Sequence, residues 1–94
     1  MLQTKLKFVK TCSACPEQYN VFLGDQQVGY VRLRWGTLRV DFPSHQHESG
    51  SKTIYRHYFE DSMKGCFDDK KEYLKYRGYI SKAIHKALRI KSIK

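Results

Sequence analysis

The stretch Val28 to Phe42, VGYVRLRWGTLRVDF, decides the fold. Apolar and polar residues alternate on both sides of a single Trp-Gly pair, which is the period of a half-buried β-strand. If Trp35 and Gly36 are the two turn residues, Arg34 faces Thr37 across the hairpin. Because tryptophan rarely adopts a positive φ, a longer loop of the same parity is the alternative. One face of the hairpin then collects the apolar residues Val31, Leu33, Leu38, Val40 and Phe42. The other face collects Tyr30, Arg32, Arg34, Thr37, Arg39 and Asp41.

The rest of the chain supplies further strands and one helix. Short strands are predicted at residues 6–9, 19–23 and 52–59, between polar or turn-forming segments. A helix is predicted from about 68 to 91, because Asp69 and Glu72 fit a capping box and apolar residues recur at helical spacing. Gly78 either loosens this helix or splits it in two. We therefore expect a single α+β domain, with an antiparallel meander of four to five strands within about 4–59 packed against a C-terminal α-helix.

Composition narrows the class of protein. The chain has 94 residues, of which 40% are hydrophobic, and its 18 lysines and arginines against 9 acids give a formal charge of +9. This excess favours an anionic partner. No apolar run approaches the roughly 20 residues that span a bilayer, and the first residues have no signal-peptide core. Three cysteines are an odd count, too few for a disulfide scaffold, so we expect a reducing, cytoplasmic location and no membrane partner.

The first candidate site is the arginine-bearing face of the hairpin. Arg32, Arg34 and Arg39 share that face with Tyr30. Arg32 directly opposite Arg39 places like charges side by side, at a cost of up to about 1 kcal/mol. Such a face could receive phosphates and stack a base on its aromatic ring. The alternative is a solvated outer face, on which arginine stems cover apolar surface.

The second candidate is a basic stripe on the helix. Residues 74–94 contain seven lysines or arginines and no acid. Four of them project together, so that a polyanion could track along Lys75, Lys82, Lys86 and Arg89. The alternative is local electrostatics, because acids at the start of a helix and bases toward its end suit the helix dipole.

The third candidate is a metal site built on cysteines. Cys12 and Cys15 form a C-x-x-C pair, and Cys66 lies far along the chain. In an up-and-down meander the 11–17 and 60–67 loops lie at the same end of the sheet. The three cysteines could then converge on zinc, with His57 or His85 as the fourth ligand. The alternative is that they are small, partly buried thiols and that no cofactor is bound.

Catalytic motifs are absent, and we expect a binding protein rather than an enzyme. The alternative is a small metal-independent ribonuclease, in which His57 and Arg56 would act on RNA. On an alternating strand, however, the side chain of His57 points away from both of its neighbours.

The stretch Gln27 to Pro43, preceded by Ala14 to Gly24, resembles small proteins of phages and prophages that have no established activity. The resemblance covers about a third of the chain and implies context rather than mechanism. Such proteins often act by binding and blocking a host machine, as inhibitors of bacterial defence do, anti-CRISPR proteins among them. We therefore expect a small basic inhibitor in the host cytoplasm that binds nucleic acid, a nucleotide or a host ribonucleoprotein. The ribonuclease and a zinc-stapled interaction module are the alternatives.

Overall fold

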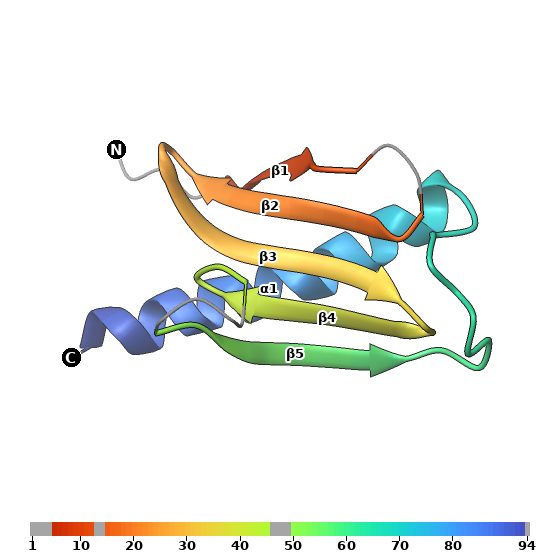
Figure 1. The fold of residues 1–94 in the computed structure, drawn as a ribbon. Coiled ribbons are helices and arrows are strands. Elements are labelled where there is room, and N and C mark those ends of the chain that lie inside the picture. Colours follow the sequence, from red (N-terminus) through yellow and green to blue (C-terminus); the bar gives the residue numbers. More distant parts are fainter. Residues whose placement is uncertain (1–4, 13–14, 46–49, 94) are drawn as a thin grey trace.

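Five antiparallel strands form one sheet, and a single helix lies across one of its faces (Figure 1). This computed structural model describes residues 5–12, 15–45 and 50–93, with side chains up to residue 90. The sheet order follows the chain order, so the topology is the meander that the sequence predicts. The elements are β1 (Lys7–Lys10), β2 (Glu17–Leu23), β3 (Gln26–Arg34), β4 (Thr37–Phe42), β5 (Lys52–Tyr58) and α1 (Lys70–Ile93).

The β3–β4 hairpin has the predicted two-residue turn and the predicted register. Arg34 pairs with Thr37, and the pairing continues without a break to Tyr30 opposite Asp41. Trp35 and Gly36 have φ values of 53° and 70°, which match the twist of the flanking strands. A Cβ at Gly36 would also lie 2.6 Å from a backbone oxygen of the 60–67 segment. The turn therefore requires glycine for two reasons, whereas Trp35 adopts its left-handed conformation against the preference of its side chain.

Helix α1 begins as its capping residues predict. The backbone N–H of Glu72 donates to Asp69 Oδ1 at 2.8 Å, and Glu72 Oε1 accepts from the N–H of Asp68 at 2.7 Å. The reciprocal bond thus goes to Asp68 rather than to the capping residue Asp69. The helix is continuous through Gly78, where an added Cβ would meet nothing within 4 Å. Gly78 neither splits the helix nor makes room for a neighbour.

The core lies between α1 and the apolar face of the sheet. Val31, Leu33, Leu38 and Val40 are almost completely buried against Ile84 and neighbouring residues of the helix. The side chain of Ile84 packs directly on the backbone of Gly29, where an added Cβ would lie 2.7 Å from Ile84 Cδ1. Alternation along β3 and β4 therefore turns the arginines of the hairpin toward the other face. No helix in the described part of the chain is long and apolar enough to cross a bilayer.

One end of the sheet is tied to the segment that leads into α1. Cys15 and Cys66 form a disulfide with their Cα atoms 5.5 Å apart. Beside it, the buried carboxylate of Glu17 accepts hydrogen bonds from the hydroxyl of Tyr19 at 2.5 Å and the N–H of Phe67 at 2.6 Å. Burial, and next the hydrogen bond to Glu17, raise the pKa of Tyr19 well above its ordinary value. The loops that we expected at one end of the sheet do meet there, but they are joined covalently.

Candidate functional site

In the described part of the chain no helix covers the sheet face opposite α1, and cross-strand pairing arranges the side chains of that face in rows (Figure 1). Arg32 on β3 pairs with Arg39 on β4, which in turn pairs with Arg56 on β5. Three arginines therefore form one row across three strands. Arg34, two residues along β3, extends the same face toward the β3–β4 turn. The sequence placed Arg56 with His57 in the ribonuclease alternative and not with the hairpin arginines, because a residue 17 positions from Arg39 joins this row only through β4–β5 pairing.

Arg39 does not belong to the solvent-facing surface that we expected. The residue is only 9% exposed, and its Nε lies 3.2 Å from Oδ2 of the completely buried Asp41. This contact is an ion pair rather than an aligned hydrogen bond. The other oxygen of Asp41 accepts a 2.8 Å hydrogen bond from the hydroxyl of Thr53 on β5. Arg39 is therefore a structural cation, and the expectation that it would face outward is wrong.

Tyr30 is also withdrawn from solvent, at 8% exposure. Its hydroxyl donates to Gln18 Oε1 at 2.7 Å, and its ring lies 4.7 Å from the ring of His45 between centroids. Because His45 follows β4 by three residues, the chain beyond β4 folds back over this part of the sheet. Tyr30 therefore helps to cover Asp41 and offers no free ring surface to a ligand.

The arginines that remain available on this sheet face are Arg32, Arg34 and Arg56, which we call the arginine face. Arg34 and Arg56 are exposed and Arg32 is half-buried. Among the described residues no carboxylate forms an ion pair with any of the three. Two strand spacings, about 10 Å, separate Arg32 from Arg56. Three guanidinium groups with their hydrogen-bond donors uncommitted to acids make this face suitable for phosphate or carboxylate groups.

Two exposed aromatic side chains border the arginine face. Trp35 is 60% exposed, and the guanidinium carbon of Arg34 lies 5.6 Å from its ring centroid. Tyr58 is 69% exposed and pairs with Thr37, two residues from Arg56 on the same side of β5. An exposed tryptophan on a left-handed backbone is an unfavourable choice for the turn alone, which points to a use for its ring. Both residues are aromatic and lie within two positions of Arg34 or Arg56 in the sequence, but the sequence analysis did not assign them to the site.

The lysine stripe lies on the other side of the molecule. Lys75, Lys82, Lys86 and Arg89 are all exposed on α1, as their spacing predicts. Since α1 packs against the apolar face of the sheet, the sheet itself separates this stripe from the arginine face (Figure 1). The two basic surfaces therefore do not combine into one interface.

The cysteines do not offer the thiolates that the zinc hypothesis requires. Cys15 and Cys66 converge, but their sulfurs are bonded to each other, and Cys12 is the free cysteine of the described chain. A cysteine that binds zinc does so as a thiolate, which a sulfur in a disulfide cannot supply. Within the described residues no three histidine, cysteine or acidic side chains form a metal-binding group. We inferred a reducing location from the odd number of cysteines, whereas the structure joins two of the three in a disulfide.

His57 and Arg56 lie on opposite faces of β5. The ring of His57 packs against Phe59 and Tyr76, with centroids 4.6 and 5.1 Å away, and its Nε2 lies 3.3 Å from the Tyr76 hydroxyl. His57 therefore faces the helix, while Arg56 belongs to the arginine face. The pair that the ribonuclease hypothesis requires is not brought together.

Comparison with protein-family models, curated proteins and solved structures finds no match to this chain.

Proposed function

We propose that this protein binds single-stranded nucleic acid on the arginine face. The observation that carries the proposal is the grouping of three guanidinium groups beside two exposed aromatic rings on the sheet face opposite α1, where none of the described carboxylates pairs with these arginines. Guanidinium groups bind backbone phosphates, and exposed rings stack on bases with little dependence on sequence. The overall charge of +9 adds long-range attraction for a polyanion.

Single strands fit this surface better than duplexes do. Trp35 and Tyr58 can stack only on bases that are already unpaired, because a duplex presents its base edges and phosphates but not its base faces. In addition, the face is a sheet surface, whereas duplex recognition in the major groove uses a protruding helix or a two-stranded ribbon. The proposed ligand is therefore a flexible strand, DNA or RNA, that lies across β3 to β5.

The test is a salt titration of binding to a fluorescein-labelled 12-nucleotide single strand, followed by fluorescence anisotropy. Each phosphate contact contributes about 0.7 to the slope of log K against log salt for single strands. The combined variant Arg32→Gln, Arg34→Gln and Arg56→Gln is expected to lower that slope by about 2. Between about 50 and 200 mM salt, those three contacts would account for a roughly 15- to 20-fold loss of affinity.

Lys71→Gln is the control for loss of a positive charge elsewhere, because Lys71 is exposed on the first turn of α1, away from the arginine face. It removes one charge from the protein and is expected to leave the slope within the experimental error. Equal slopes for the wild type and the triple variant would contradict the proposal. So would tighter binding to a duplex of the same length.

A role as an inhibitor of host defence, which the resemblance to phage proteins implies, would use the same surface. We propose that such inhibition acts on the exposed strand of a host ribonucleoprotein, so that the three arginine substitutions would abolish nucleic-acid binding and inhibition together.

A further inference from the structure

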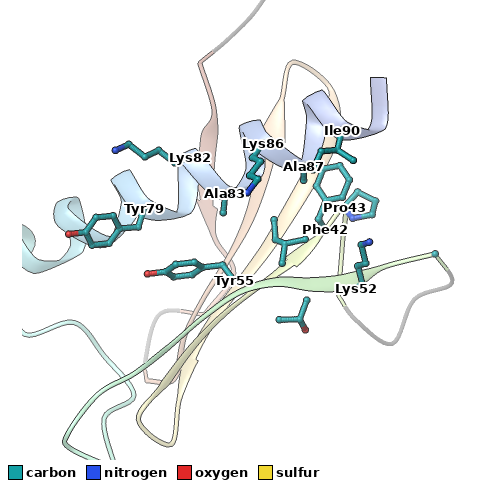
Figure 2. Close-up of a pocket in the computed structure, with 13 residues that line it drawn as sticks. Phe42, Pro43, Lys52, Tyr55, Tyr79, Lys82, Ala83, Lys86, Ala87 and Ile90 are labelled. Carbon is teal, nitrogen blue, oxygen red and sulfur yellow. The ribbon is translucent and has the colours of Figure 1, made fainter. Parts of the chain in front are cut away.

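A groove of about 1100 Å³ runs along the flank of α1 that faces β5 (Figure 2). It lies on the helix side of the sheet, so it is separate from the arginine face. Its lining residues are Phe42, Pro43, Gly50, Lys52, Thr53, Ile54, Tyr55, Tyr79, Lys82, Ala83, Lys86, Ala87 and Ile90.

The groove exists because one helix is too narrow to cover five strands. The outer strands of such a sheet lie about 19 Å apart, whereas a helix with its side chains is about 10 Å wide. Beside α1, the apolar side chains of Ile54 and Tyr55 on β5 are left only partly covered. On the helix, Tyr79 and Ile90 remain 42% and 54% exposed at the two ends of the groove. Part of the apolar surface of β5 beside α1 thus stays accessible.

Positive charge surrounds this apolar strip. Figure 2 shows the ammonium group of Lys86 descending from α1 toward the groove and that of Lys52 rising from β5. Lys82 stands one helical turn before Lys86 on the same wall. Among the described residues no carboxylate lines the groove, and none forms an ion pair with these three lysines.

We propose that the groove binds an amphipathic helix of a partner protein whose polar flanks carry glutamate or aspartate. From Tyr79 to Ile90 the wall spans about 16 Å, or three helical turns, which matches the anchor spacing of helix-in-groove recognition. The apolar stripe of the partner would cover Ile54, Tyr55 and the small side chains of Ala83 and Ala87. Its acidic flanks would pair with Lys52 and Lys86.

A second copy of this chain fits the groove less well. Its only described helix would bring the lysine stripe, with Lys82 and Lys86, against the same lysines of the first copy. Like charges at such a contact oppose association. Charge complementarity therefore selects an acidic partner helix over self-association.

The test uses two synthetic, fluorescein-labelled 16-residue peptides with the same leucine stripe at helical spacing. One carries glutamate on its flanks, and the other carries lysine at each of those positions. Anisotropy titrations with the full chain are expected to give at least tenfold tighter binding for the glutamate peptide. Lys86→Glu is expected to weaken binding of the glutamate peptide and to strengthen binding of the lysine peptide. A general loss of structure could not produce these opposite effects.

Two further variants separate this site from the arginine face. Lys71→Glu makes the same charge change outside the groove and is expected to leave the peptide preference intact. The triple arginine variant is expected to bind the glutamate peptide as tightly as the wild type does but to bind the single strand more weakly. Either proposal can therefore fail without the other. Loss of peptide binding in that triple variant would show that the peptide does not bind in the groove.

The proposal would also be overturned by equal binding of the two peptides or by an unchanged preference in Lys86→Glu. If neither peptide binds, dodecanoate can be titrated in their place. Binding of dodecanoate that Lys86→Glu weakens would identify a small amphiphile as the occupant instead. Self-association that Lys86→Glu promotes and that the glutamate peptide does not reverse would identify a second copy of the chain.

Discussion

Replacement of Trp35 by alanine tests base stacking independently of charge. Trp35 is the only tryptophan in the chain and is 60% exposed next to the arginine face. A base stacked on an aromatic side chain contributes about 1–3 kcal/mol by alanine substitution. Arg34 already lies over the ring at 5.6 Å, so we expect one ring face to serve one base and the effect to fall at about 1–2 kcal/mol. Trp35→Ala should therefore weaken single-strand binding by roughly 5- to 30-fold.

The same tryptophan supplies the assay. Its fluorescence should be quenched as an unlabelled strand is added to the wild type, with the same midpoint as the anisotropy titration of a labelled strand. Because no charge is removed, the slope of log K against log salt should be the same for Trp35→Ala and for the wild type. The arginine variants, in contrast, should change that slope.

Trp35→Phe is the matched control, since it keeps an aromatic ring at the same backbone position. It should retain most of the affinity, and circular dichroism should show the same fold for all three proteins. Stacking would be refuted if the strand bound without quenching Trp35, or if Trp35→Ala bound as tightly as the wild type.

The remaining predictions concern stability. Gly78→Ala should raise the free energy of unfolding by about 0.5–1 kcal/mol in a urea titration, because an exposed helical glycine with free space around it gains from a Cβ; a loss would show that the helix is not regular there. Gly29→Ala should lower it by about 1–3 kcal/mol, because the new methyl group would overlap the helix. Burial raises the pKa of Tyr19 above its ordinary value of 10.0, so the folded state binds this proton more tightly than the unfolded state does. The free energy of unfolding should therefore fall as the pH rises above about 10. Tyr19→Phe should make this fall less steep. The same dependence on alkaline pH in the wild type and in the variant would contradict the role of Tyr19.

The elements that depend on neighbouring residues could be predicted from the sequence. The register of the β3–β4 hairpin follows from alternation about Trp35 and Gly36, and the structure confirms each predicted pair. The start of α1 follows from Asp69 and Glu72, which lie within one helical turn of each other. The α+β class follows in turn, since a half-buried meander and an amphipathic helix must cover one another.

The composition of the candidate site depended on contacts between distant residues. Asp41 and Arg39 are adjacent on one strand face, but their burial requires Thr53 from β5 and the return of the chain at His45. Local alternation placed Arg39 on the correct face, yet it contains no information about what covers that face. Arg56 entered the site for the same reason, through a strand pairing that no local pattern specified.

What the sequence determined by itself is the direction of each side chain along its own element, because strand and helix periods are set by the local backbone. Tertiary structure alone decided which of those side chains remain in contact with water. Thus it buried Arg39, joined Cys15 to Cys66 and left a lysine-rimmed groove beside α1. The physical reason is that exposure and pairing depend on groups brought together from different parts of the chain, and the periodicity of one segment does not record its neighbours.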